Sequence, residues 1–238
     1  YFDIMSEGKR QSQQDKQVIQ SLVSDISHQV KTPIANIKMF TNILQQHQLP
    51  PEKQAEFLRT MEGQIDKLDF LMQSLIKMSR LETGTFVLHP QEGRLADTIA
   101  LAMSAVWAKA EAKEISLSAD CDSSICVQHD PKWTAEALGN ILDNAIKYTP
   151  PGGCIQVSAT QYELFCRIDV RDNGIGVAEE EQAQIFGRFY RGRQVREQEG
   201  LGIGLYLARE IAQKQGGYLK LSSRPGQGST FSLYLPRG

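Results

Sequence analysis

Long apolar runs, paired cysteines and an excess of charge of either sign are all missing from this sequence. No apolar stretch approaches the roughly 20 residues that a membrane-spanning helix needs. The formal charge is −2 over 238 residues, so the chain as a whole has no general attraction for nucleic acid. Residues 1–10 lack the basic stretch and apolar core of a signal peptide. The composition predicts a globular chain, and the start at Tyr1 rather than Met suggests a piece of something longer.

The cysteines form no CxxC pair that would indicate a metal or redox motif. Cys121 and Cys126 are followed by His129, so a zinc site at these three residues is an alternative. The spacing between the two cysteines is long, however, and Cys126 lies in an alternating, strand-like stretch. The simpler interpretation is that these two, together with Cys154 and Cys166, are buried free thiols in a reducing cytoplasm.

Glycine is scarce in the first part of the chain and frequent in the second. Of 19 glycines, only Gly8 and Gly63 lie in the first 80 residues, whereas 14 lie from Gly152 onward. Because glycine weakens helices and permits tight turns, the two parts should differ in architecture. We expect two domains, residues 1–82 and 83–238.

Apolar residues in the first 80 positions recur at spacings of three and four, which predicts two long amphipathic helices. One run extends from Ile19 to Leu44 and the other from Leu58 to Leu75. Residues 45–51 separate them, and Pro50 and Pro51 can end one helix and start the next. A lone two-helix hairpin leaves one side uncovered, so we expect pairing with a second copy into a four-helix bundle.

After position 85 the pattern changes to short strands interleaved with helices, which predicts an α+β sandwich with mostly antiparallel pairing. The expected helices are residues 95–112, 132–147 and 204–215. The expected strands are residues 86–88, 115–117, 125–128, 155–160, 164–170, 218–222 and 230–235.

His28 lies on the side of the first helix that faces away from its apolar seam. It is about 200° around the helix from both Ile26 and Val30, so it should be exposed to water. Five residues later, Pro33 should bend or loosen the helix. Exposure suits a nucleophile that another domain must reach, although for His28 in isolation a solvated helix histidine with an incidental proline is the favoured explanation.

Asn140 and Asn144 lie one turn apart on the predicted helix of residues 132–147. Asparagine has a low-to-average helix propensity, so two asparagines one turn apart inside a helix suggest a role other than helix formation. Amide oxygens suit a Mg²⁺ ion that also binds phosphate, and Lys147 can offset phosphate charge. Two surface asparagines without function are the alternative.

Two glycine clusters stand in the second half: residues 172–176 follow a strand candidate, and residues 200–204 stand at the start of a helix candidate. Taken alone, each glycine pair is better explained as a tight turn. Neither matches a dinucleotide-binding fingerprint, and residues 187–194 lack the lysine and hydroxyl of a P-loop. What is left is glycine backbone at a helix N-terminus, which can approach phosphates, and an acid, Asp172, at the end of a strand. A buried carboxylate there could accept a hydrogen bond from the adenine amino group.

Taken in order, these segments strongly resemble the catalytic core of a bacterial sensor histidine kinase. Residues 27–33 resemble that family's phosphoacceptor box and residues 140–148 its asparagine box. Residues 172–176, 185–191 and 200–204 resemble the first glycine, phenylalanine and second glycine boxes. The resemblance implies a dimerisation and phosphotransfer hairpin followed by a Bergerat-type ATP-binding sandwich, with a mobile lid at about residues 192–199. It also implies the cytoplasmic portion of a cell-membrane protein, with membrane segments upstream.

The resemblance further implies a role for each matching residue. His28 would be the phosphoacceptor, with Thr32 assisting dephosphorylation of the regulator. Asn140 and Asn144 would bind Mg²⁺ and phosphate, and Asp172 would recognise adenine by a hydrogen bond. The remaining nucleotide contacts would be Lys147, Tyr148, Gly174, Gly176, Arg191, Gly200, Gly202 and Gly204. The implied reaction moves the γ-phosphoryl group of ATP to His28 and then to an aspartate of a response regulator.

Two positions depart from the family pattern. Gln29 stands where an acid usually follows the phosphoacceptor, and an amide cannot act as a carboxylate base. Gly187 replaces an acid of the phenylalanine box, which should loosen the attachment of the lid. A nucleotide-binding scaffold with an impaired kinase step is therefore one alternative. A related ATPase outside signalling is another, which Asn140 disfavours because those enzymes place a water-activating Glu there.

Overall fold

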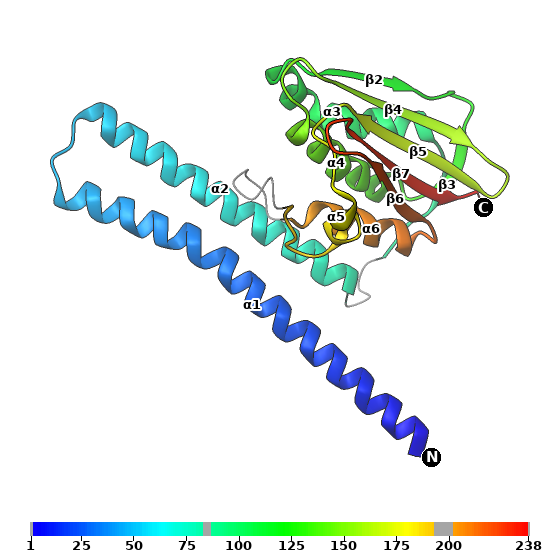
Figure 1. Ribbon diagram of the computed structural model, residues 1–238, viewed down its shortest axis with the longest axis horizontal. Helices are drawn as coiled ribbons and strands as arrows, with labels where there is room; N and C mark the ends of the chain where they lie inside the picture. The colour runs from blue at the N-terminus through cyan, green and yellow to red at the C-terminus, as the bar shows by residue number, and fades with distance from the viewer. Residues whose placement is uncertain (1, 83–86, 193–201, 238) are drawn as a thin grey trace. The chain divides into compact units, whose positions relative to one another are not determined.

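The computed structural model describes residues 2–82, 87–192 and 202–237, and the chain divides into two compact units, Tyr1–Ile76 and Lys77–Gly238 (Figure 1). The first unit is helical and the second combines helices with β-strands, which confirms the predicted fold class. None of the described helices is both long enough and apolar enough to cross a bilayer.

The first unit is a hairpin of two helices, α1 (Phe2–Gln46) and α2 (Pro51–Glu82). Pro51 occupies the first position of α2, where its missing N–H costs nothing. The rings of Phe40 and Phe57 pack across the hairpin with centroids 5.0 Å apart. Pro33 is buried and α1 continues through it, so the proline does not end the helix.

The apolar seam of α2 is only half covered within one chain. Leu58, Ile65 and Met72, spaced seven residues apart, expose 56%, 55% and 58% of their surface. The seam residues between them, Met61 and Leu68, are half-buried. One of the two seam positions of each heptad thus lacks apolar cover in the single chain.

The second unit contains a five-stranded sheet in the order β2-β4-β5-β7-β6. β2 is parallel to β4, and the other neighbouring strands are antiparallel, as expected from the sequence. Buried side chains alternate along the central strands, with Ile168 and Val170 of β5 opposite Leu233 and Phe231 of β7. The strand bounds are Ser116–Asp120 (β2), Cys154–Gln161 (β4), Phe165–Asp172 (β5), Tyr218–Ser223 (β6) and Ser229–Pro236 (β7).

Helices α3 (Leu95–Ala112), α4 (Pro131–Tyr148) and α6 (Gly204–Lys214) lie on one side of this sheet (Figure 1). The sequence predicted all three to within one residue at each end. Asp130 caps the N-terminus of α4, because its side chain accepts a hydrogen bond from the backbone N–H of Trp133 at 3.0 Å. Its C-terminal carbonyls accept hydrogen bonds from Nζ of Lys113, which fixes the end of the helix that carries the asparagines.

A second, two-stranded sheet pairs β1 (Gln91–Arg94) with β3 (Cys126–His129). The strand expected at residues 86–88 is not there: residue 86 lies outside the described residues, and Val87 and Leu88 are not in a strand. The polar segment Gln91–Arg94 forms the strand instead, because β3 supplies its hydrogen-bonding partner. A short helix α5 (Glu179–Gln182) and a 3₁₀ turn η1 (Gln184–Phe186) were also not expected.

The zinc alternative at Cys121, Cys126 and His129 is wrong. Cys126 and His129 lie on opposite faces of β3, the first exposed and the second buried. Both ring nitrogens of His129 already have partners, the hydroxyl of Thr98 and the carbonyl of Val127, each at 2.8 Å. Because side chains alternate along a strand, Cys126 and His129 cannot bind one metal ion. Cys166 is buried as predicted, but Cys126 and Cys154 are exposed, so the prediction of buried thiols is wrong for those two.

The contacts divide the chain between Ile76 and Lys77, inside α2, rather than at the end of that helix. The last turns of α2 belong to the second unit. Met78 and Leu81 are buried, and Nζ of Lys77 lies 2.5 Å from a carboxylate oxygen of Glu136 on α4. The domain boundary between residues 82 and 83 stays a prediction.

Candidate functional site

Asn140 and Asn144 of α4 are half-buried and present their side-chain oxygens away from the helix backbone. The amide nitrogen of Asn140 donates to the carbonyl of Glu136 at 2.9 Å, and that of Asn144 donates to the carbonyl of Asn140 at 3.1 Å. Because each amide nitrogen is held by the preceding turn, each Oδ1 is turned outward. Two amide oxygens one turn apart can serve a cation that takes its other ligands from phosphate or water.

Asp172 ends β5 as a buried carboxylate, with 6% of its surface exposed. Its Oδ1 accepts hydrogen bonds from the backbone N–H groups of Gly174 at 2.8 Å and Ser229 at 3.2 Å. Burial raises the pKa of this carboxyl, and the two N–H donors partly oppose that rise. Since both donors bind Oδ1, Oδ2 is the oxygen left to meet a ligand.

The first glycine cluster fits where a side chain would not. A Cβ on Gly174 would lie 2.5 Å from the carbonyl oxygen of Tyr148, at the end of α4. Gly176 has a φ of +71°, and its Cβ would lie 2.1 Å from the carbonyl oxygen of Arg224, in the turn between β6 and β7. The loop is further tied by a hydrogen bond from the N–H of Ile175 to the Tyr148 carbonyl at 3.2 Å. Glycine here allows the loop to join α4 to the β6–β7 turn.

The second glycine cluster lies against the asparagines. A Cβ on Gly204 would lie 3.1 Å from Oδ1 of Asn140, so the start of α6 faces the amide oxygen directly. Among the described residues no side chain caps the N-terminus of α6, which leaves its first N–H groups able to bind an anion. Gly202 has a φ of +70° and approaches the backbone of Phe189 and Tyr190. Gly200 lies outside the described residues.

The segment 185–191, compared above with a phenylalanine box, is fixed at several points to the domain. Phe186 is buried and packs edge-on against Phe231 of the sheet, with centroids 6.4 Å apart. Arg188 donates from Nη2 to the hydroxyl of Tyr206 on α6 at 3.0 Å. Gly187 has an extended backbone conformation that any residue can adopt. The predicted loosening of the lid by Gly187 stays a prediction, because residues 193–199 are outside the described residues.

Cationic side chains surround Tyr148 at the C-terminal end of α4. Nζ of Lys147 lies 4.9 Å from the centroid of the Tyr148 ring. Burial raises the pKa of the Tyr148 hydroxyl, while the positive charge of Arg191 lowers it. Lys147 and Arg191 thus lie beside the same ring, at the end of the asparagine face.

In the hairpin unit, His28 and Thr32 are both exposed on α1, and Gln29 is half-buried. The hydroxyl of Thr32 is 3.5 Å from the backbone carbonyl of His28, which places both residues on adjacent turns of one helix face. The predicted exposure of His28 is confirmed for the single chain. This pair belongs to a different unit from the residues above.

Ser229 and Gly228 are site residues that sequence reasoning missed. Ser229 holds Asp172 through its N–H, and a Cβ on Gly228 would lie 2.0 Å from the Asp172 carbonyl oxygen. The side-chain oxygen of Ser223 accepts from the N–H of Val177, beyond the first glycine cluster. The turn signal Gly226-Gln-Gly228 between two strand candidates could have indicated a tight connection, but only strand pairing brings it to Asp172.

The second unit therefore brings together the chemical groups that a nucleotide with a polyphosphate chain requires. A buried carboxylate can accept a hydrogen bond from a base. Outward amide oxygens can bind a phosphate-bound cation, and the N–H groups at the start of α6 can meet phosphate oxygens. The roles of the individual residues stay predictions.

Asp172→Asn should change the pH dependence of stability in a defined direction. A raised carboxyl pKa in the folded state means that wild-type stability falls as pH rises from the unfolded value, near 3.8, through the folded one. Asparagine keeps an oxygen for Gly174 and Ser229 but cannot ionise. The variant should therefore lose this part of the pH dependence and be at least as stable as wild type at pH 7.

Urea unfolding at several pH values, followed by fluorescence of Trp107 and Trp133, measures this, because both tryptophans lie in the second unit. A variant that is clearly less stable than wild type at neutral pH would contradict the claim that ionising Asp172 costs folding free energy.

Two family models match successive parts of the chain. Residues 18–84 match the His Kinase A (phospho-acceptor) domain, and residues 129–238 match the histidine kinase-, DNA gyrase B-, and HSP90-like ATPase. The sensor-like histidine kinase SenX3 of Mycobacterium tuberculosis is 30% identical over 90% of this chain. The chain spans 53% of SenX3, so it corresponds to about half the length of that relative.

Solved structures share the fold. The Acinetobacter baumannii histidine kinase AdeS matches with a TM-score of 0.73 and 20% identity, over 89% of this chain and 98% of that one. The histidine kinase ThkA, solved in complex with the response regulator protein TrrA, matches with a TM-score of 0.79 and 20% identity, over 98% of this chain and 66% of that one. With both domain models in this order and kinase homologues over nine-tenths of its length, the chain belongs to the sensor histidine kinase family, of which it carries the catalytic core.

Proposed function

We propose that this chain binds ATP in its second unit and transfers the γ-phosphoryl group to His28. The observation that supports this best is the convergence of Asp172, Asn140 and Asn144 with the uncapped start of α6 in one domain. The exposed His28 in a separate helical unit supplies an acceptor that such a donor domain can reach.

Recognition of adenine rests on Oδ2 of Asp172. Because Oδ1 already accepts two backbone hydrogen bonds, Oδ2 faces the base and accepts from its exocyclic amino group. Guanine has a carbonyl at that position and would leave the buried carboxylate unpaired, which is costly. Tyr148 packs near the base, since Gly174 and Ile175 hold the first glycine loop against its backbone.

The phosphate chain lies between α4 and the start of α6. Asn140 and Asn144 present oxygens suited to Mg²⁺, which would neutralise charge on the phosphates when bound. The N–H groups at Gly204 and beyond bind phosphate oxygens, and the absence of a Cβ at Gly204 leaves Asn140 Oδ1 unobstructed. Lys147 and Arg191 add positive charge at the end of α4.

In the transfer itself, a ring nitrogen of His28 forms a bond to the γ-phosphorus as the bond to the β–γ bridging oxygen breaks, and ADP leaves. The imidazole loses the proton on its other nitrogen. Gln29 cannot accept that proton as a carboxylate would, so the proton passes to solvent. Positioning and charge neutralisation therefore supply most of the acceleration.

The second transfer moves the phosphoryl group from His28 to a carboxylate oxygen of an aspartate on a response regulator, breaking the N–P bond and forming an O–P bond. ThkA, which shares this fold, was solved with a response regulator. Thr32, one turn from His28, has its hydroxyl on the same exposed face and would assist hydrolysis of the aspartyl phosphate.

The chain forms a homodimer through the hairpin. Leu58, Ile65 and Met72 recur every seven residues on α2 and each exposes more than half of its surface in the single chain. This spacing matches one seam of a coiled-coil-like bundle, and a second hairpin would cover it.

A nucleotide-binding scaffold with an impaired kinase step is the second candidate, and Gln29 is the observation that favours it. Such a protein would bind ATP at the same site but form no phosphohistidine.

His28→Ala should abolish incorporation of label from γ-labelled ATP while ATP affinity stays unchanged, because His28 lies outside the nucleotide-binding unit. The wild-type label should be acid-labile and base-stable, as phosphohistidine is. His47→Ala removes another exposed histidine of the same unit and should label like wild type. Acid-labile label persisting on His28→Ala would remove this residue as the acceptor, and unlabelled wild type would favour the scaffold.

Gln29→Glu should accelerate labelling of His28 by about tenfold or more, since a positioned general base contributes on the order of a hundredfold or more. Gln46→Glu adds the same charge at an exposed position at the end of α1 and should label at the wild-type rate. Initial rates at saturating ATP and Mg²⁺ measure the effect. Equal rates for wild type and Gln29→Glu would show that the proton of His28 does not limit the transfer.

Asp172→Asn should weaken ATP binding by roughly 1–3 kcal/mol. The N–H groups of Gly174 and Ser229 would donate to the oxygen of the new amide, so its NH₂ group would face the adenine amino group and could not accept a hydrogen bond from it. The preference for ATP over GTP should shrink with it. Calorimetric titration measures both affinities. Asp169→Asn, on the opposite face of β5, should bind ATP like wild type; an unchanged ATP affinity in Asp172→Asn would exclude the adenine assignment.

A further inference from the structure

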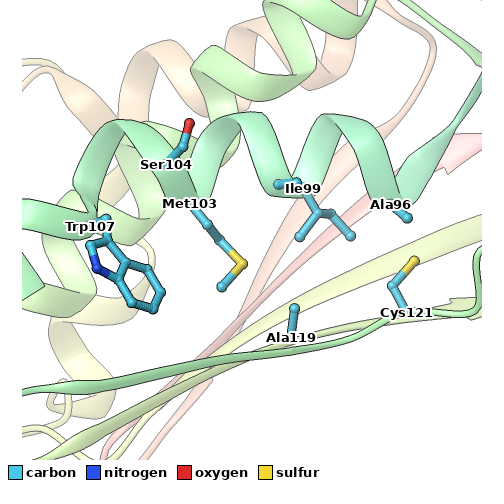
Figure 2. Close-up of a pocket in the computed structure, with 8 residues that line it drawn as sticks. Ala96, Ile99, Met103, Ser104, Trp107, Ala119 and Cys121 are labelled. Carbon is cyan, nitrogen blue, oxygen red and sulfur yellow. The ribbon is translucent and has the colours of Figure 1, made fainter.

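A hollow of about 620 Å³ lies between α3 and β2, outside the nucleotide site described above (Figure 2). From α3, Ile99, Met103 and Trp107 line it, and Ala119 and Cys121 line it from β2 and the residue after that strand. Figure 2 shows the Met103 and Trp107 side chains directed toward the strand side. Trp107, one of the lining residues, exposes 52% of its surface.

β2 stands at the end of the five-stranded sheet and pairs only with β4 among the described residues. An edge strand presents a row of backbone N–H and C=O groups to any further strand. Natural edge strands are commonly protected by lysine or proline. The sequence of β2, Ser-Leu-Ser-Ala-Asp, contains neither, and most of its residues are exposed.

Two carboxylates lie next to Cys121, which lines one end of this groove. Asp120 and Asp122 flank Cys121, and after burial their negative charges are the further cause that raises the pKa of the Cys121 thiol. Asp122 also accepts a hydrogen bond from the N–H of Ser124, which holds its carboxylate in place. Arg94, near the start of α3, is paired with Asp97 at 3.0 Å.

From these three features we propose that the groove binds an extended segment of a partner protein, which adds to the free edge of β2 as a further strand. Alternate side chains of that segment face α3, so they are apolar and pack on Met103 and Trp107. The end of the segment beside Asp120 and Asp122 carries Lys or Arg.

A displayed library of random twelve-residue peptides, selected on the full chain, tests this proposal. The enriched peptides should show apolar residues at alternate positions with a basic residue at one end. Synthetic copies should bind the wild type in a fluorescence-polarisation titration. Ala100→Arg, an exposed α3 residue that lines the groove, should weaken binding by about tenfold or more.

Leu101→Arg is the matched control, because Leu101 is exposed on the same helix but does not line the groove. It should bind the peptides as wild type does. Ser104→Arg, also at the groove, provides a second variant in case Ala100→Arg does not fold, and an unchanged ATP affinity confirms folding of either variant.

The proposal is overturned if no peptide is enriched, if the enriched peptides lack alternation, or if they bind Ala100→Arg and wild type equally. Sedimentation provides one more outcome. If the wild type forms assemblies larger than a dimer that Ala100→Arg abolishes, the groove binds a second copy of this chain, and the partner segment is wrong.

Discussion

The buried carboxylate of Asp172 is the interaction on which the site of the second unit depends. Its Oδ1 joins the N–H groups of Gly174 and Ser229, which belong to the loop after β5 and to the start of β7. A buried charge costs free energy unless it is hydrogen-bonded, and its raised pKa shows that the cost is only partly offset. Burial of this carboxylate lowers the stability of the domain but fixes a hydrogen-bond acceptor in the site. The proposed hydrogen bond to adenine explains why the domain contains such a group.

Close backbone contacts extend this arrangement from Asp172 to the rest of the site. The first glycine loop touches the end of α4 through Gly174 and the β6–β7 turn through Gly176, and the second touches Asn140 through Gly204. A Cβ on Gly174 or Gly176 would clash with backbone at the first two contacts, and a Cβ on Gly204 would crowd the side chain of Asn140. As a result, segments between residues 140 and 229 lie close together, which preorganises the donors and acceptors around the proposed phosphate chain.

Prediction from the sequence was accurate where the local residue pattern alone determines the structure. The helix at residues 95–112 was predicted to its ends, and the exposed position of His28 followed from helical geometry alone. The prediction failed where strand pairing outweighs the local preference of the sequence. The polar segment Gln91–Arg94 has no strand pattern of its own, but it forms a strand because it pairs with β3. Likewise nothing in the local sequence around Ser229 indicates a partner for Asp172, since that contact depends on the register of β5 with β7.

By itself, the sequence determined the two-part architecture, the order of the family's boxes and the chemical types available at each. Those properties follow from periodicity, from glycine content and from the kinds of groups each side chain carries. The tertiary structure alone decided that both donors to Asp172 share one oxygen, that Asn140 and Asn144 turn their oxygens outward, and that β2 leaves an apolar groove beside Trp107. Such features are geometric relations between segments far apart in the chain, and only strand pairing and helix packing bring those segments together.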